Sequence, residues 1–595
     1  MSKIVYVCVR DPFQSALVAN AVSAIADRLL PDNIQHKAPR ILQSGGIVAG
    51  ISNPTDLIAA RGTSVAAGHL VDPSEWEKPG TGRPDGAYAL FRSDDAVVEI
   101  VSDTLASRTV WYVMTDEMFI AATSQRAIVA LLRSFHFNPA VVPWILATGS
   151  LGPGLSWDRR IRHVAGATTV TLDRIAWSVT ERTEPTRFVS RIASDSENER
   201  RVADALTHAI GAAEVADPRW AITLSGGVDC RVILSLLKDT TGLRAVTWGL
   251  RKSLEDPTSD AQVAKRLAQH FRLEHLYLET DLAEEPIDRV LARFVANGEA
   301  RIDHLSGYAD GFQLWRRMVD VGIQGIIRGD QVFGMKPVRS PRDVRARVGL
   351  PLWSDFRELP PLDRFGLLAP DLPAELEPLA GESLDTWRDR LHEKFRVPFV
   401  YGALSDLKLP YVEILDPLLS GGLIELIRQL PDALRTNKLL LRRIAHSLAP
   451  AIPFATSVAI QPAGEILRSP TVVEFLRDSL RDQSLGSAIP REFTDFVDTG
   501  LVQSAMNPRL AARRRLRRAV KSVIPSWAER LRHRAAPSAE PDRNMLALRV
   551  YLVSQAGRMY AEDAAAIRPR LLDLIPARIP HKIQLSNCDP QHKVS

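Results

Sequence analysis

The chain has 595 residues, of which 45% are hydrophobic and 24% are charged. This composition is that of a globular protein with two or more domains, and it excludes a chain that is mostly disordered, collagen-like or coiled coil. The net charge of +5 is small for this length and does not indicate a nucleic-acid-binding protein. Three scattered cysteines, Cys8, Cys230 and Cys588, do not suit a disulfide framework and favour a reducing compartment.

Neither a targeting segment nor a membrane span is expected. The apolar run after Met1 is too short for a signal peptide and is typical of a β-strand. No stretch of about 18 apolar residues is present, so the sequence predicts no transmembrane helix. We expect a cytoplasmic protein.

Residues 1–190 are predicted to be rich in β-strands. Short runs with aromatic or β-branched residues lie between turn residues. They predict strands at 87–91, 96–101, 109–114 and 168–172, with a helix at 125–134. We expect layered sheets with helices in this part of the chain.

The pattern changes near residue 195, where a polar and charged stretch indicates a domain junction. From there to about residue 450, predicted strands alternate with predicted helices. Strands are expected at 220–224, 243–249, 275–279 and 322–327, and helices at 229–237 and 260–269. This alternation is typical of a parallel sheet covered by helices.

Two segments lie outside this alternation. Residues 337–400 are rich in Pro and Arg and predict a mobile excursion. Residues 480–595 form a tail without a clear motif, in which ten residues between Arg509 and Arg534 are Lys or Arg. The basic segment 509–534 is interpreted either as a solvated Arg-rich helix or as a docking surface for another protein or an anionic membrane.

The most informative segment is 220–238, WAITLSGGVDCRVILSLLK. An apolar strand ending at Leu224 runs into Ser225-Gly226-Gly227, and a helix begins at or just before Asp229. Glycines let the backbone turn tightly, and the free N–H groups of such a loop and of the helix N-terminus bind anions. The expected ligand is a pyrophosphate group, with Asp229 binding the accompanying Mg²⁺. The alternative is a strand–turn–helix junction that happens to contain two glycines.

This segment is not a Walker A loop, which requires GxxxxGK[ST]. It resembles the SGGxDS pyrophosphate loop of the ATP pyrophosphatases, which release AMP and pyrophosphate. The resemblance implies that the ATP-binding residues include Leu224, Ser225, Gly226, Gly227, Asp229 and Cys230. Cys230 stands where that loop has its last Ser, and a thiol is a weaker hydrogen-bond donor than a hydroxyl. Cys230 could instead be a nucleophile, but no base lies near it in the sequence.

The resemblance extends to the asparagine synthetase B superfamily over residues 1 to about 450. The stretch 244–250, RAVTWGL, resembles the family's second strand. This implies that Val246, Trp248 and Gly249 line an adenine pocket.

A second stretch, 325–334 (GIIRGDQVFG), resembles the family signature GEGxDExFGG. The resemblance implies that Gly329 belongs to the ATP site and that Asp330 is the Mg²⁺-binding Asp. Asp229 and Asp330 would then share the metal. The family's catalytic Glu is replaced here by Ile327 or its neighbour, which is unlike a standard asparagine synthetase.

Residues 415–450 resemble the family stretch that carries an active-site lysine. Lys438 occupies the position of that lysine, which lies over the phosphates and stabilises the charge that develops when the acyl-adenylate is attacked. Its alternative is a solvated cation at the start of a helix. Glu413 is a further candidate, for orienting or deprotonating an amine.

Stretches between 85 and 173 resemble the class II glutamine amidotransferase domain. Active members use Cys at position 2 as the nucleophile, whereas this chain has Ser2, and the family's glutamine-holding motifs are not visible. We infer a retained scaffold without glutaminase activity, so ammonia from glutamine is not the expected nucleophile.

The resemblance therefore implies a fold with both α/β and α+β character. Residues 1–190 form a degenerate class II glutamine amidotransferase-like domain, an Ntn-hydrolase-like layered sheet. Residues 195–480 form a doubly wound parallel-sheet ATP pyrophosphatase domain of the asparagine synthetase type. Residues 481–595 are a C-terminal extension.

Superfamily members with a dead amidotransferase domain include β-lactam synthetase and the lasso peptide cyclases. The stretch 297–318 together with RGDQVFG is most similar to the cyclases, which implies ATP- and Mg²⁺-dependent macrolactam formation on a precursor peptide. A leader peptidase or leader-binding maturation protein is the expected partner. The alternatives are a small-molecule amide synthetase using free ammonia, and a non-catalytic scaffold.

Overall fold

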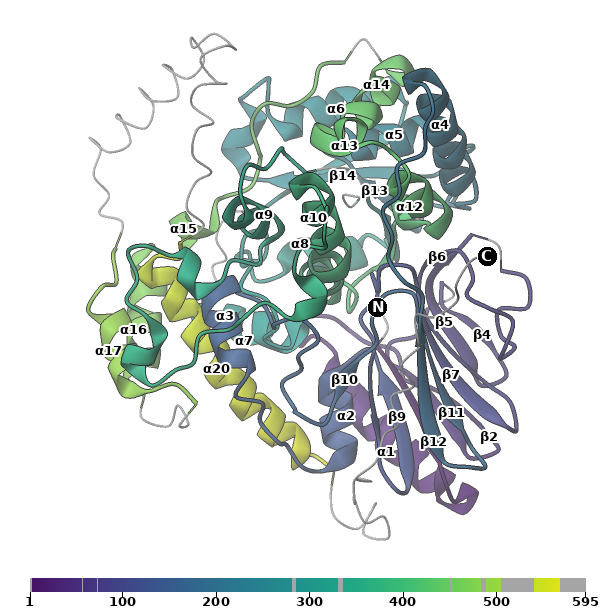
Figure 1. Cartoon of the computed structure of the whole chain (residues 1–595), viewed down its shortest axis with the longest axis vertical. Helices are drawn as coiled ribbons and strands as arrows, with labels where there is room; N and C mark the ends of the chain where they lie inside the picture. The colour runs from purple at the N-terminus through teal and green to yellow at the C-terminus, as the bar shows by residue number, and fades with distance from the viewer. Residues whose placement is uncertain are drawn as a thin grey trace.

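The computed structural model describes residues 3–55, 57–71, 73–280, 285–329, 335–449, 452–482, 488–503 and 540–567. The predictions for Ser2, Asp330 and the basic segment 509–534 lie outside these residues. The described chain is mixed α/β and contains two antiparallel sheets and one parallel sheet (Figure 1). Among its helices, none has the length and apolar character needed to cross a membrane.

Two six-stranded antiparallel sheets pack face to face in the N-terminal part. The first has the order β10-β8-β9-β1-β3-β2. Its strands are β1 (Ile4–Val9), β2 (Arg40–Ser44), β3 (Ile47–Ile51), β8 (Trp111–Met114), β9 (Met118–Ala122) and β10 (Arg162–His163). The second has the order β12-β11-β7-β6-β5-β4. Its strands are β4 (Ala59–Arg61), β5 (Ser64–Leu70), β6 (Gly86–Ser93), β7 (Val97–Ser102), β11 (Thr168–Asp173) and β12 (Ser178–Thr183).

Strand β1 shows why the first sheet is buried on both faces. Because side chains alternate along a strand, Ile4, Tyr6 and Cys8 point into the core between the sheets. The intervening valines join the core beneath the helices. Those helices are α1 (Ser15–Ala26), α2 (Gln125–Leu132) and α3 (Val141–Thr148).

The parallel sheet has five strands in the order β15-β14-β13-β16-β17. Their bounds are β13 (Trp220–Thr223), β14 (Arg244–Gly249), β15 (Glu274–Glu279), β16 (Gly325–Ile327) and β17 (Glu413–Leu415). Neighbouring pairs are parallel throughout. The predicted alternation of strands and helices therefore forms one parallel sheet.

Helices cover both faces of this sheet. One face packs on α4 (Asp195–Gly211), α5 (Asp229–Leu236), α6 (Asp260–His270), α12 (Gly421–Arg428) and α14 (Leu439–Leu448). The other face packs on α7 (Ile287–Gly298) and α8 (Gln313–Asp320). The sheet is thus doubly wound, with β13, its first strand in sequence, lying in the centre between β14 and β16. Ligands of such sheets bind where the strand order reverses, at the carboxyl ends of the strands. Here that position is the end of β13 and β16.

The prediction of a mobile excursion over 337–400 is wrong. This segment contains α9 (Pro341–Val348), α10 (Leu384–Leu391) and a π-helix (His392–Tyr401). Its apolar residues Trp353, Leu362 and Trp387 are buried in the core. The Pro and Arg residues that suggested mobility instead begin helices and form buried ion pairs.

The tail also contributes a packed element, α20 (Arg543–Ala564). It contacts α2 and α3 of the N-terminal part, α7 beneath the parallel sheet, and the late helices α16 (Pro470–Arg481) and α17 (Arg491–Asp498) (Figure 1). Arg549 of α20 forms an ion pair with Asp303, and Asp563 with Arg126. The C-terminal region thus fastens the two halves of the molecule together.

Candidate functional site

The glycine loop follows β13 directly. The strand ends at Thr223, and α5 begins at Asp229. A Cβ atom on Gly226 would lie 2.2 Å from the Cβ of Ala455, so only glycine fits there. Gly227 donates its N–H to the Ser225 hydroxyl over 3.2 Å. The loop is therefore a tight turn at the reversal of strand order.

Cys230 anchors this loop from inside. Its buried sulfur donates to the Ser225 carbonyl over 3.2 Å and lies 3.4 Å from the Ser225 nitrogen, which donates to it. Burial raises the pKa of the Cys230 thiol, so it stays protonated at neutral pH. A neutral, buried thiol is a poor nucleophile. The alternative interpretation of Cys230 as a nucleophile therefore finds no support in its surroundings.

Gly329 brings the second motif against the first. It follows β16, the neighbour of β13, and a Cβ atom on it would lie 2.6 Å from the Cβ of Asp229. Asp330 comes next in the chain but lies outside the described residues. The two motifs, about a hundred residues apart in sequence, thus meet because the carboxyl ends of adjacent parallel strands share one edge.

Lys438 reaches the same point from a third segment. Its ammonium group forms an ion pair with the carboxylate of Asp229, and the two side chains are 14% and 16% exposed. Lys438 and Asn437 both have left-handed backbone conformations, with φ of 55° and 57°, directly before α14. The chain therefore turns sharply to direct Lys438 toward the loop.

The three residues predicted to line the adenine pocket lie along β14. The side chain of Val246 is buried in the core, while its carbonyl accepts the N–H of Leu224 over 2.8 Å. Trp248 packs edge-to-face on Trp315, with ring centroids 5.7 Å apart. Gly249 closely approaches Ala459, whose oxygen would be 2.6 Å from an added Cβ. The strand thus contacts the start of the loop at Val246 and ends at Gly249 beside Ala459, and the adenine-lining role of the three residues stays a prediction.

Glu413 does not join this group. It is the first residue of β17 and pairs in register with Gly325, the first residue of β16, at the amino edge of the sheet. Its carboxylate forms a buried ion pair with Arg108 of the N-terminal part. The structure therefore places Glu413 in the contact with the N-terminal part and away from Asp229 and Lys438, which argues against the predicted role of orienting or deprotonating an amine.

Residues 452–459 border the loop, and sequence reasoning missed them. Ala455 donates its N–H to the Gly226 carbonyl over 3.1 Å, and Leu250 donates to the Ala459 carbonyl over 2.8 Å. Arg231 of α5 holds the segment by donating to the Pro453 carbonyl over 3.0 Å and stacking on Phe454. The signal that could have found this segment was its small residues, since Ala455 faces Gly226 and Ala459 faces Gly249.

Asp260 is a second missed residue. At the start of α6, it accepts the Gly226 N–H over 3.1 Å. Burial raises its pKa, and the hydrogen bond from Gly226 opposes this shift. Its carboxylate thus lies against one of the loop amides.

The chemistry of the edge fits a phosphate chain with a divalent cation. The N-terminus of α5 has no side-chain cap, and the partial positive charge of a helix N-terminus attracts anions. Asp229 supplies a carboxylate, the type of ligand that Mg²⁺ prefers. Within the described residues, no group of three or more His, Cys, Asp or Glu side chains is placed so that it could hold a metal ion.

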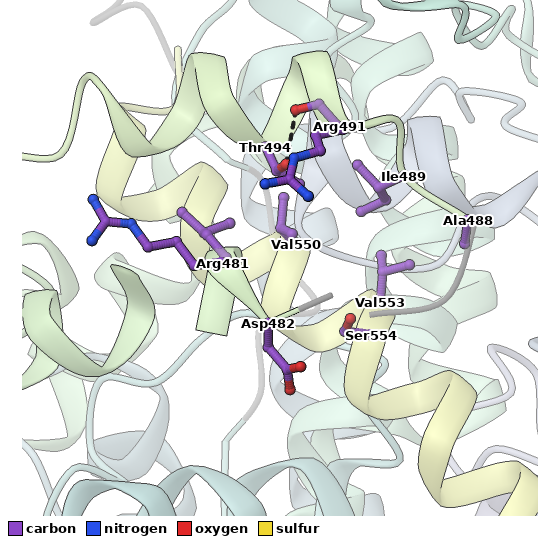
Figure 2. A pocket seen from close by; sticks show the side chains of 10 residues that line it. Arg481, Asp482, Ala488, Ile489, Arg491, Thr494, Val550, Val553 and Ser554 are labelled. Atoms are coloured by element: carbon purple, nitrogen blue, oxygen red, sulfur yellow. Dashed lines mark hydrogen bonds between the residues drawn. The ribbon is translucent and has the colours of Figure 1, made fainter. Parts of the chain in front are cut away.

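A cavity of about 280 Å³ lies elsewhere. Figure 2 shows it between α16, α17 and α20, with Arg481 and Arg491 around it. None of its lining residues belongs to the loop, to β16 or to the turn at Lys438. It is therefore separate from the candidate site.

A family model described as asparagine synthase matches residues 201–393. The match supports the asparagine synthetase superfamily and indicates an ATP-dependent carbon–nitrogen ligase. It includes the loop, β14, Gly329 and Asp330, and it ends before Glu413 and Lys438. The roles of the individual residues stay predictions.

The other comparisons add less. No curated protein matches the chain. One similar solved structure is titled an allosteric regulatory enzyme of purine biosynthesis, with 9% identity, a TM-score of 0.20 and coverage of 55% of this chain and 79% of that one. Another is the glutamine phosphoribosylpyrophosphate amidotransferase of B. subtilis, also with 9% identity and a TM-score of 0.20, covering 48% and 83%.

Proposed function

We propose that this protein adenylates a side-chain carboxylate of a precursor peptide and closes a macrolactam ring with the peptide's N-terminal amine. The observation that carries the proposal is the Asp229–Lys438 ion pair at the reversal of strand order, beside Gly329. Three distant segments meet there, and each resembles an ATP-handling segment of the asparagine synthetase superfamily. AMP and pyrophosphate would be the by-products.

Each residue of the edge has a task in this reaction. The N-terminus of α5 and the loop before it bind the β- and γ-phosphates, with the Gly226 and Gly227 amides exchanging their contacts with Asp260 and Ser225 for phosphate oxygens. The α-phosphate is left open to the peptide carboxylate. Lys438 compensates the charge that develops as pyrophosphate leaves. Asp229, with Asp330, would hold Mg²⁺, which supplies charge neutralisation on the phosphates.

Ring closure requires the amine of the same peptide to attack the adenylated carboxyl carbon. The amine displaces AMP, a carbon–nitrogen bond forms, and the amine loses a proton. A prefolded peptide makes this a well-oriented intramolecular step. Water must be excluded, because it would hydrolyse the adenylate. Residues 452–459, which lie against the loop, are suited to shield that side.

The N-terminal part is proposed to be a scaffold without glutaminase activity. Its amidotransferase-like start carries Ser2 in place of the Cys nucleophile. Its contact with the C-terminal part is closed by buried ion pairs, including Arg108–Glu413 and Lys3–Asp406. An amine from a peptide, rather than ammonia from glutamine, is the nucleophile that suits this arrangement.

The remaining expectations are part of the proposal. The protein acts in the cytoplasm on a precursor peptide, with a leader peptidase or leader-binding protein as partner. It does not act on nucleic acid. The basic segment 509–534 is a candidate contact for that partner or for an anionic membrane surface.

Mass spectrometry of a candidate precursor peptide tests the proposal. A peptide from a short reading frame beside the gene is incubated with the protein, the neighbouring peptidase, ATP and Mg²⁺. Loss of one water from the core peptide, with one AMP per ring, is the expected result. AMP formation with free Asp and ammonia but no dehydrated peptide would support a small-molecule amide synthetase. No AMP with any of these substrates would support a non-catalytic scaffold.

A further inference from the structure

Helix α10 buries charged residues that the proposed chemistry does not use. Its sequence is LDTWRDRL, and Arg388, Asp389 and Arg390 are all buried, with Arg388 fully inaccessible. Charged side chains are almost never fully buried unless they are paired. Each of these three is paired, and their partners divide them into two groups.

Arg388 and Asp389 are directed toward the turn that carries Lys438. Asp389 forms an ion pair with Arg435 over 2.9 Å. Arg435 is itself buried, and it also donates to Thr386 on α10 over 2.9 Å. Arg435 lies three residues before Lys438, at the end of α13 (Asp432–Arg435). The start of the turn is therefore fastened to α10.

Arg388 connects this turn to the segment after the second motif. It donates to the Asp389 carboxylate over 2.8 Å and to the Lys336 carbonyl over 3.0 Å. Met335, the preceding residue, accepts the Asn437 N–H over 3.1 Å. Helix α10 thus holds both Lys336 and Arg435, next to the contact between Met335 and Asn437.

The turn needs such support. Asn437 and Lys438 are consecutive residues in the left-handed region, which non-glycine residues rarely adopt. Such conformations persist where the surrounding structure over-determines them. The contacts from α10 and from Met335 supply that constraint on one side, and α14 supplies it on the other.

We propose that Asp389 and Arg435, with Arg388 as their brace, are positioning residues that hold Lys438 at Asp229. This inference rests on the proposed function of Lys438, and it adds residues that touch neither nucleotide nor peptide. Their removal would leave ATP binding in place and disturb the catalytic step, because a displaced ammonium no longer meets the developing charge.

The helix offers a matched control. Arg390, two residues from Arg388, forms a two-pronged ion pair with Glu382, with both distances 2.8 Å. This pair is as buried as the Asp389–Arg435 pair, but its other contacts are to the backbone of Glu375, Glu377 and Leu379. Glu382→Gln thus breaks a similar pair on the same helix without touching the turn.

The first experiment measures AMP formation by Asp389→Asn, Arg435→Gln and Glu382→Gln. For the first two, kcat should fall by about 10- to 100-fold while KM for ATP changes by less than about 3-fold. Glu382→Gln should keep kcat near the wild-type value. Asp389→Glu and Arg435→Lys, which preserve the charges, should recover part of the loss. Equal losses of kcat in Glu382→Gln and Asp389→Asn would overturn the proposal.

The second experiment does not depend on turnover. The free protein is treated with acetic anhydride, and acetylation of Lys438 is quantified by peptide mass spectrometry. Asp389→Asn and Arg435→Gln should raise the acetylation rate of Lys438, because the ammonium leaves its ion pair, while Glu382→Gln should not. An unchanged rate in folded Asp389→Asn and Arg435→Gln would contradict the positioning role, even if the wild-type protein forms no AMP.

A double variant separates positioning from general stability. In the Lys438→Ala background, Asp389→Asn should lower kcat no further, because the residue that it positions is already gone. Thermal midpoints of all variants are measured in parallel. A further loss of activity in the double variant at an unchanged thermal midpoint would assign Asp389 a role independent of Lys438.

Discussion

Each of the two edges of the parallel sheet has an ion pair between a carboxylate and a basic side chain, but the two pairs serve different purposes. At the carboxyl edge, Asp229 pairs with Lys438, and both side chains retain some exposure. At the amino edge, Glu413 pairs with Arg108, with exposures of only 3% and 7%. Both carboxylates were candidates for chemistry from the sequence. Their position along the strands, rather than their pairing, separates a site from a domain contact.

The difference follows from chain direction. In a parallel sheet, every strand delivers its following loop to one edge, and glycine-rich turns and helix N-termini gather there. The opposite edge receives the chain returning from the helices. Here the N-terminal part covers that edge through Arg108, which also donates to the Ile414 carbonyl over 2.7 Å.

The largest expected effect is at the carboxyl edge. Lys438→Ala should lower the rate of AMP formation by about 10²- to 10³-fold, because the charge on the leaving pyrophosphate loses its counter-charge. Asp229→Asn should be comparably impaired. Steady-state AMP release measures both effects, and binding of a fluorescent ATP analogue to Lys438→Ala should persist. Wild-type turnover in either variant would refute the assignment of this edge.

The next effect is one of stability at the amino edge. Arg108→Met leaves the Glu413 carboxylate buried without its partner, which should cost about 3–5 kcal/mol of unfolding free energy. Urea unfolding measures this loss, and the surface pair Arg200–Asp204 provides a control with little expected change. If Arg108→Met kept its stability but lost AMP formation, the amino edge would have a role in the chemistry and the comparison of the two edges would be wrong.

Asp303 should make the contact between the halves sensitive to acid. Burial raises the pKa of its carboxyl, but Arg549 and His304 oppose this and hold the pKa below the usual 3.8. A depressed pKa gives stability that is present above the unfolded-state value and lost as pH falls through the folded-state value. The urea concentration at the unfolding midpoint should therefore decrease as the pH drops below about 4. The decrease should be smaller in Asp303→Asn. An identical pH dependence in Asp303→Asn would contradict this.

The smallest effect should come from Cys230→Ser. The hydroxyl would restore the stronger hydrogen-bond donor of the related loop, so nucleotide binding should change by no more than about 10-fold. The buried neutral thiol should resist iodoacetamide in the native protein and react after unfolding, as measured by mass spectrometry. Rapid native alkylation with loss of activity would indicate a reactive cysteine instead.

The parallel sheet and the meeting of the two motifs could be predicted from sequence. The alternation of apolar strands and helices predicts a parallel sheet. The glycine loop indicates the edge of that sheet at which Gly329 contacts Asp229. The link to Lys438 came only from a family resemblance, because no local pattern distinguishes it from a solvated lysine at the start of a helix.

The rest depended on contacts between distant segments. Glu413 lies two residues from the carboxyl end of a three-residue strand, so an alignment error of a few residues moves it from one edge to the other. Residues 337–400 were predicted to be mobile because a segment rich in Arg and Pro shows no regular spacing of apolar residues. In the fold, Arg388 and Arg390 are nevertheless buried, and each forms an ion pair. Only the folded chain shows those partners.

The most direct measurement compares AMP formation by Asp229→Asn and Glu413→Gln, per mole of folded protein, with the same peptide, ATP and Mg²⁺. Circular dichroism gives the folded fraction of each variant. The account predicts that Glu413→Gln keeps turnover near the wild-type value once corrected for folding, while Asp229→Asn loses nearly all of it. Turnover retained in Asp229→Asn and lost in folded Glu413→Gln would contradict the placement of the chemistry at the carboxyl edge.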